Sequence, residues 1–398
     1  MAGKAKSVCL IAAVEVMTMS VWFVSAAILP DLIAEADLKP AAAAALSSAV
    51  QIGFVVGAIS LALHGTPDRY DPRKVVAVSA IIGSVANLAL LVTPPGGIAQ
   101  ILLRAVTGVC LAGIYPVGMK IVISWGLKDR GFLVGLLVGA LTLGTSLPHL
   151  VAFLGGTNWR LTVAITSGLA ASAAILVMLT SLGPHHALAR AFDPGAIRLA
   201  WVDRRIRLAF SGYLGHMWEL YAFWAWIGTA LGVAFASKLA VEDAQSFAKL
   251  ITFLAIASGG LLCLPAGKLA DRIGKARVAT LAMVLSGSSG LATAAFFGGP
   301  IWLLAIVVII WGATIIPDSA QFSAMVADYA PPDRAGSLLT FQTALGFTLT
   351  FFTVQLLPVF VSTFGWQATL VMTVLGPIYG CEAMRRLMRD EPRLPPSA

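Results

Sequence analysis

Twelve apolar blocks of membrane-spanning length constrain the fold of this chain more than any other feature. A helix needs roughly 20 residues to cross a hydrocarbon core about 30 Å thick. Short polar or Gly/Pro-rich joints separate the blocks, and 58% of the residues are hydrophobic while 12% are charged. The sequence therefore predicts an all-α integral membrane protein. The predicted spans are residues 7–29, 45–64, 74–93, 98–122, 132–154, 160–182, 208–230, 247–266, 278–297, 301–326, 337–361 and 367–384.

The distribution of lysine and arginine predicts how the chain crosses the membrane. Cytoplasmic loops retain positive charge, and one alternating set of joints holds most of these residues. The other joints keep only Lys39, Arg160, Lys238 and Lys249. We therefore predict a bacterial inner-membrane protein with both termini in the cytoplasm. This topology, with membrane lipid as a partner, explains the net charge of +8 and gives no reason to invoke nucleic acid.

Motifs for enzymatic or metal chemistry are missing from the sequence. It has no GxxxxGK[ST] phosphate loop, so ATP hydrolysis is not indicated. It also lacks HExxH, Cys/His metal spacing and a Ser/His/Asp arrangement. The four cysteines fall in or beside apolar blocks, without a spacing that suggests disulfides. The sequence predicts neither an enzyme nor a protein with a metal or cofactor.

The second half of the sequence repeats the first at an offset of about 204 residues. The aligned pairs are Glu15 with Glu219, Trp22 with Trp226, Asp68-Arg69 with Asp271-Arg272, Pro116 with Pro317, Asp129-Arg130 with Asp333-Arg334, and Trp159 with Trp366. These six pairs, all in the same order, indicate a duplication. We predict two pseudo-symmetric six-helix bundles, residues 1–182 and 208–398, the second ending in a short cytoplasmic tail. Residues 183–207 form the predicted cytoplasmic linker.

The joint between the eighth and ninth blocks resembles a known loop signature. Its sequence GKLADRIGKARVA, residues 267–279, resembles the G-x-L-a-D-R-x-G-r-r/k motif of the major facilitator superfamily. The first-half copy, HGTPDRYDPRKVV, keeps Asp68 and Arg69 but has His64 and Asp71 in place of the glycines. In the fourth block, LLRAVTGVCLAG resembles another signature of the same family. The second-half loop is the stronger match.

The resemblance to this family implies two bundles around a central cavity, which opens by rocking of one half against the other. The solute site is expected near the middle of the membrane. In the family, the loop Asp and Arg close the cytoplasmic side. Asp271 and Arg272 match these gate residues position by position, and Asp68 and Arg69 match them less closely. The protein is expected to work as a monomer.

Two glutamates lie near the middle of predicted spans. Glu15 is in the first block and Glu219 in the seventh. An ionised group at the membrane centre costs about 2.5 to 3.5 kcal/mol, so such residues face a wet cavity or a partner. Burial favours the neutral acid, which suits a group that binds and releases a proton as access alternates. The alternative is a permanently protonated glutamate that hydrogen-bonds a neighbouring helix.

Both glutamates belong to stripes at helical spacing. The stripes are Glu15, Thr18, Met19 and Trp22 on the first span, and His216, Glu219, Phe223 and Trp226 on the seventh. We expect them to face one another between the halves. His216 can hydrogen-bond Glu219 one turn away and relay a proton, unless it is structural. Trp22 and Trp226 are the aromatics expected to stack on a solute, whereas some of the other aromatics near them are packing residues.

Three further charged residues lie inside predicted spans. Arg104 matches the family's fourth-helix arginine and suits a carboxylate or similar oxyanion, with a structural ion pair as the alternative. Lys120 follows on the same helix, and Asp318 stands beside the helix-weakening Pro317. All three are candidates for the solute and proton pathway. His149 is placed near the outer edge of its helix.

These residues favour secondary active transport of a small organic solute, an anion or zwitterion moved together with protons. Arg104 and Lys120 favour the negative charge on the solute. One alternative is proton-coupled efflux of an amphipathic organic cation, which the acids and aromatics suit. A second is a membrane sensor or assembly factor that keeps the fold without transport.

Overall fold

The structure is a computed structural model that describes residues 2–126, 129–185, 193–331 and 334–390. All regular elements of the described part are helical, which confirms the predicted fold class. The long helices of the first half are α1 (Ala2–Met19), α2 (Val24–Ala36), α3 (Pro40–His64), α5 (Pro72–Leu88), α6 (Ile98–Ala112), α7 (Tyr115–Ile123), α8 (Arg130–Leu154) and α9 (Trp159–Met178). Those of the second half are α11 (Arg204–Ala236), α12 (Val241–Ile273), α13 (Lys275–Ala295), α14 (Ile301–Ile315), α15 (Ser319–Tyr329), α16 (Ala335–Thr373) and α17 (Leu375–Asp390). Short elements join them: α4 (Thr66–Arg69), α10 (Ile197–Val202), and the 3-10 turns Ala89–Val92 and Pro194–Ala196.

Eleven helical segments of the described part are long and apolar enough to cross a membrane. The last of them, Ala335–Asp390, is too long for one crossing. Gly365 interrupts it with a φ of 77° and a ψ of 171°, which glycine adopts without the strain of a Cβ atom. With that break the described segments correspond to the twelve predicted spans.

Three spans are broken near their middle. In two of them, Pro116 and Pro317 lie at the break and cannot donate a backbone hydrogen bond to the preceding turn. The first span breaks between α1 and α2 without a proline. There, Thr18 Oγ1 donates to Val14 O at 2.7 Å and Ser20 Oγ donates to Met17 O at 2.6 Å. Such hydroxyls compete with the backbone of a helix and weaken its last turn.

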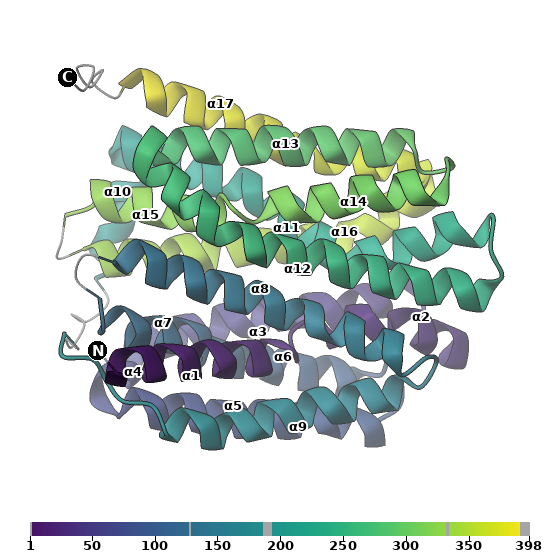
Figure 1. Ribbon diagram of the computed structural model, residues 1–398, viewed down its shortest axis with the longest axis horizontal. Coiled ribbons are helices and arrows are strands. Elements are labelled where there is room, and N and C mark those ends of the chain that lie inside the picture. Colours follow the sequence, from purple (N-terminus) through teal and green to yellow (C-terminus); the bar gives the residue numbers. More distant parts are fainter. Residues whose placement is uncertain (1, 127–128, 186–192, 332–333, 391–398) are drawn as a thin grey trace.

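The helices lie along the long axis of the molecule in two groups (Figure 1). Helices α1 to α9 fill the lower part of the view and α11 to α17 the upper part, and both termini lie at the left. We call that end the terminal end and the opposite one the far end. The groups meet mainly through α8 against α12 and α3 against α16. A Cβ on Gly139 would lie 2.8 Å from Gly260 O, so the absence of side chains lets α8 and α12 approach closely.

Candidate functional site

Six buried aromatic side chains meet where the two groups of helices face each other. Trp22 and Phe23 come from the break between α1 and α2, Phe54 from α3, Tyr221 and Trp224 from α11, and Phe347 from α16. We call these six residues the aromatic cluster. The Trp22 ring centroid lies 5.1 Å from that of Phe54, 5.5 Å from that of Phe347 and 6.0 Å from that of Tyr221. These are ordinary distances for favourable aromatic pairs.

Polar atoms in and near the aromatic cluster have no hydrogen-bond partner in the described part. They include the indole Nε1 of Trp22 and of Trp224, and Nε2 of His149. His149 Cε1 lies 4.0 Å from where a Cβ of Gly228 would be, one turn beyond Trp224 on α11. The side chain of His149 is therefore buried between α8 and α11, near the cluster.

Glu15 is 1% exposed and only partly bonded. Its Oε1 has no hydrogen-bond partner in the described part, and its Oε2 lies 3.1 Å from where a Cβ of Gly118 would be. Tyr115, at the start of α7, lies one turn before Gly118. The carboxyl group is therefore packed between α1 and α7, close to the break in the fourth span.

Glu219 has the same exposure but two hydrogen bonds. Ser286 Oγ donates to its Oε2 at 2.9 Å, and Trp311 Nε1 donates to its Oε1 at 2.8 Å. These donors belong to α13 and α14. The carboxyl group therefore joins three helices of the second half.

His216 contacts Asp318 and not Glu219. Its Nδ1 lies 2.9 Å from Asp318 Oδ1, and both side chains are buried. Asp318 stands at the break between α14 and α15. The predicted hydrogen bond between His216 and Glu219 is wrong, because His216 Nδ1 lies against Asp318 and its Nε2 has no hydrogen-bond partner in the described part.

The predicted stripe on α11 faces its own half. Glu219 and Phe223 both contact Trp311, with the Phe223 and Trp311 centroids 4.8 Å apart. Trp226 Nε1 donates to Val354 O at 3.1 Å. Instead, Tyr221 and Trp224 lie on the face that meets the first half. The expectation that the two stripes oppose each other is wrong on the α11 side.

Arg104 is fully buried and bonds the broken first span. It donates to Val21 O at 2.9 Å, to Trp22 O, and to Asn87 Oδ1 at 3.2 Å. No carboxylate lies within ion-pair distance in the described ranges. The guanidinium instead satisfies carbonyls that the helix break leaves without intrahelical donors.

The remaining predicted site residues lie closer to the terminal end. Lys120 is half-buried in the last turn of α7. Among the predicted gate residues, Arg69, Asp271 and Arg272 are exposed at helix ends. The side chain of Asp68 lies outside the described part. Their role in a gate stays a prediction.

At the far end, polar contacts join the two halves. Lys249 Nζ on α12 lies 2.8 Å from Asp31 Oδ2 on α2 and donates to Gly156 O at 2.8 Å. Gln355 Nε2 on α16 donates to Ser48 Oγ on α3 at 2.7 Å. The Lys249 and Asp31 side chains are both buried. The two halves are thus closed against each other at this end.

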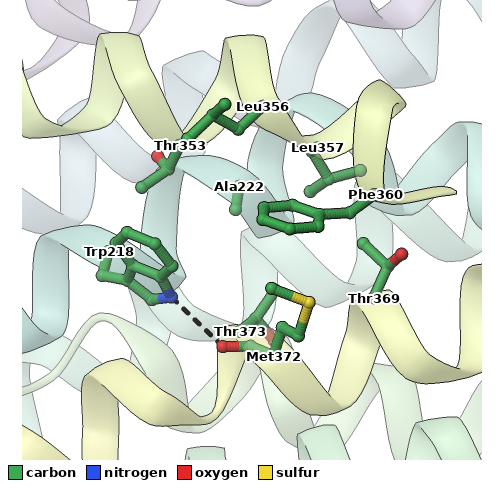
Figure 2. A pocket seen from close by; sticks show the side chains of 9 residues that line it. All are labelled: Trp218, Ala222, Thr353, Leu356, Leu357, Phe360, Thr369, Met372 and Thr373. Atoms are coloured by element: carbon green, nitrogen blue, oxygen red, sulfur yellow. Dashed lines mark hydrogen bonds between the residues drawn. The ribbon is translucent and has the colours of Figure 1, made fainter. Parts of the chain in front are cut away.

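A small pocket lies apart from these groups, between α11 and α16 (Figure 2). Its volume of about 20 Å³ has room for one water molecule. Its only drawn hydrogen bond runs from Trp218 Nε1 to Met372 O at 3.3 Å. The lining is almost wholly apolar, so this pocket is no candidate for the solute site. Within the described residues, no group of three His, Cys, Asp or Glu side chains could hold a metal ion.

The fold and the buried polar groups define a polytopic membrane transporter. The family model of the Major Facilitator Superfamily matches residues 11–341. The chain belongs to this family and is a transporter of that class. No match was found among curated proteins.

Solved structures with this fold include several transporters. A point mutant of the nucleoside transporter NupG has a TM-score of 0.72 and 17% identity, over 96% of this chain and 99% of that one. The xylose transporter XylE from E. coli has 0.74 and 13%, over 98% of both chains. A bacterial homolog of the human lysosomal transporter Spinster has 0.73 and 14%, over the whole of both chains. At these identities the likeness concerns the fold.

Proposed function

We propose that the protein carries a small organic solute across a bacterial inner membrane by alternating access, in symport with protons. The observation that carries this proposal is Glu15, whose buried carboxyl group has an oxygen without a hydrogen-bond partner in the described part. A structural acid would have both oxygens bonded, because burying an unpartnered polar atom is unfavourable. An acid in this state gains a partner when it becomes accessible to water.

The proton step follows from the cost of ionisation in a dry site. When closed inside the protein, Glu15 is neutral, since no cation pairs with it in the described part. Opening to one side hydrates the carboxyl group, which then releases its proton. Asp318 with His216 forms a second buried group that can hold a proton. Glu219, bonded by two donors, keeps three helices in position.

The solute is proposed to carry no net charge. The case for an anion depended on Arg104, whose guanidinium already donates to two carbonyls and an amide oxygen. A zwitterion or a neutral molecule fits this arrangement, because neither needs a surplus of positive charge in its site. Lys120 is half-buried on α7 and remains the candidate for a polar contact with the solute.

Alternating access requires a closure at each end. Lys249 with Asp31, and Gln355 with Ser48, join the halves at the far end. These contacts must break when that end opens. At the terminal end, Asp68, Arg69, Asp271 and Arg272 are proposed to form the opposing closure. The far end is proposed to face away from the cytoplasm.

Proton flux in proteoliposomes tests the coupling. Uridine and xylose are the first probes, because similar folds belong to a nucleoside and a xylose transporter. During uptake, symport makes the external medium more alkaline. Solute uptake without any proton movement, in vesicles that are otherwise proton-tight, would disprove the proposed coupling.

Antiport of an amphipathic organic cation is the second candidate. The observation in its favour is the aromatic cluster, since cations bind to the faces of aromatic rings. In the same vesicles, loaded with acid inside, antiport releases protons as tetraphenylphosphonium enters. That direction of proton movement separates the two mechanisms.

A further inference from the structure

We propose that the aromatic cluster is the solute site and that the solute contains a flat, conjugated, uncharged ring with hydrogen-bond acceptors at its edge. This inference rests on the proposed function, because it names the class of solute carried.

The cluster lies where a carried solute must bind. Trp22, Phe23 and Phe54 belong to the first half, and Tyr221, Trp224 and Phe347 to the second. A ligand bound between the halves contacts both of them, as alternating access requires. The far-end contacts of Lys249 and Gln355 cover one side of this region.

The ring faces of the aromatic cluster favour a flat ligand. Trp22 and Phe347 stack with an angle of 27° between their planes, and Trp22 and Phe54 are tilted by 30°. When the halves move apart, the faces of Trp22 and Phe347 separate. A planar ring can then take the place of either face, with the same offset stacking. A saturated sugar ring offers no such face.

Two indole N–H groups of the cluster lack acceptors although the protein bonds its other deeply buried indoles. Trp159, Trp226 and Trp311 donate to Glu35, Val354 O and Glu219. Trp22 and Trp224 are buried to a similar degree, yet their Nε1 atoms have no partner in the described residues.

A phenylalanine would keep an aromatic ring at either position without burying an unbonded donor, and burying one is unfavourable. The two donors therefore point to a ligand that supplies acceptors, such as ring nitrogens or carbonyl oxygens. Phe23 and Tyr221 each contact both tryptophans, so the two unpartnered donors belong to the same cluster.

The charged groups at this break disfavour an ionic ring. Arg104 donates to the backbone carbonyl of Trp22 itself. Glu15 lies two turns earlier on α1 and packs toward α7. Neither charge is directed at the cluster, so a charged ring would lose its hydration without gaining a partner.

Equilibrium binding to the purified full-length protein tests this inference without a pH gradient. The probes are uridine and nicotinamide as flat uncharged rings, xylose as a saturated ring, benzoate as a flat anion and tetraphenylphosphonium as an aromatic cation. We expect uridine or nicotinamide to raise the melting temperature, since a ligand of the folded state stabilises it. Stabilisation by xylose, benzoate or tetraphenylphosphonium alone, or by none of the probes, overturns the inference.

Matched tryptophan variants separate binding from stability. Trp22→Phe and Trp224→Phe each leave a small cavity, as does Trp226→Phe, but they remove a donor that has no acceptor, so each should lower the ligand-free melting temperature less than Trp226→Phe does. Each should weaken binding of the flat probe by about tenfold, the worth of one hydrogen bond. Trp226→Phe should lower the melting temperature more and leave the affinity for the flat probe unchanged, because its donor already bonds Val354 O. Unchanged affinity in both cluster variants overturns the inference.

The outcomes also distinguish this inference from the proposed function. Binding of a flat neutral probe, together with its uptake into proteoliposomes without proton movement, supports the solute class and disproves symport. Proton-coupled uptake of xylose or benzoate, without binding of a flat neutral probe, supports symport and disproves the solute class.

Discussion

Glu15 and Glu219 are aligned in the sequence repeat but have different surroundings. They stand 204 residues apart in a repeat, and each is 1% exposed. Glu219 accepts hydrogen bonds from Ser286 and Trp311, whereas Glu15 Oε1 has no partner in the described part. Each half has a glutamate at this position, but only the second half supplies hydrogen-bond donors to both of its carboxyl oxygens. An equivalent acid can therefore be a structural group in one half and a proton carrier in the other.

The broken spans differ between the halves in a related way. The first span breaks at Trp22, and Arg104 bonds the carbonyls at this break. Its counterpart α11 is continuous over 33 residues. The helix of the second half that corresponds to α6 is α14, and it has no charged residue that could take the place of Arg104. The second half instead places Asp318 at its own break, against His216. Each half stabilises one interrupted helix with a buried ionisable group, but the sign of the charge is opposite.

The largest expected effect separates the two glutamates. Glu15→Gln should abolish pH-driven solute accumulation while leaving solute exchange intact, because glutamine cannot release a proton. Glu219→Gln should retain accumulation, since an amide can still accept from Trp311. Both are measured in proteoliposomes with and without a pH gradient. Loss of accumulation in Glu219→Gln alone would reverse the roles proposed for the two halves.

Removal of Arg104 tests the difference between the broken and the continuous span. Arg104→Met should destabilise the protein by about 3 kcal/mol, because two backbone carbonyls and Asn87 Oδ1 lose a charged donor. The measurement is thermal or denaturant unfolding in detergent, with Arg104→Lys as the variant that keeps the charge. Full stability in Arg104→Met would show that the break does not depend on the guanidinium.

Trp311→Phe would make the second half resemble the first. It removes the donor to Glu219 Oε1 and leaves that oxygen without a partner, as in Glu15. We expect a loss of about 1 to 3 kcal/mol in the free energy of unfolding. Trp302→Phe is the matched control, because Trp302 is 65% exposed on the same helix. An equal effect of both substitutions would argue against a special role of the Glu219 bond.

The sequence alone predicted the architecture well because its signals are local. Span length and apolar composition are properties of contiguous residues, so they could be read without coordinates. The burial of Glu15, Arg104, Glu219 and Asp318 also followed, since lipid does not solvate charge. The breaks at Pro116 and Pro317 coincide with helix-weakening residues, although α8 and α16 continue through Pro148 and Pro358.

The partners of these groups could not be predicted, since they depend on the rotation of each helix about its axis. Tyr221 and Glu219 are only two residues apart on α11, yet they face different halves. Phe54 and Phe347 join the aromatic cluster from α3 and α16, and no motif marks them. Trp226 was preferred over Trp224 as a residue that stacks on the solute, although Trp224 lies one turn after Tyr221.

The smallest expected effect on stability concerns the two copies of the loop motif. The first-half copy has Asp71 where the second-half copy has Gly274. Asp71 accepts a hydrogen bond from the Arg73 backbone N–H at 2.9 Å and so caps α5. The Arg73 side chain also donates to it and, as the largest influence, holds the pKa of Asp71 below its usual range. Gly274 has a φ of 96°, so its copy of the loop depends on backbone freedom instead.

Asp71→Ala and Gly274→Ala should each cost about 1 kcal/mol, but with different pH dependence. Because the pKa of Asp71 is lowered on folding, its contribution is present above the unfolded pKa near 4 and disappears as the pH falls through the lower folded value. The loss in Asp71→Ala should therefore shrink at the acidic end of a series from pH 7 to about pH 3. The loss in Gly274→Ala comes from backbone strain and does not depend on pH. No atom lies within 4 Å of the added Cβ, so only the backbone angle of residue 274 is unfavourable. Unfolding midpoints over that series measure both, and parallel curves would mean that the two loops are stabilised in the same way.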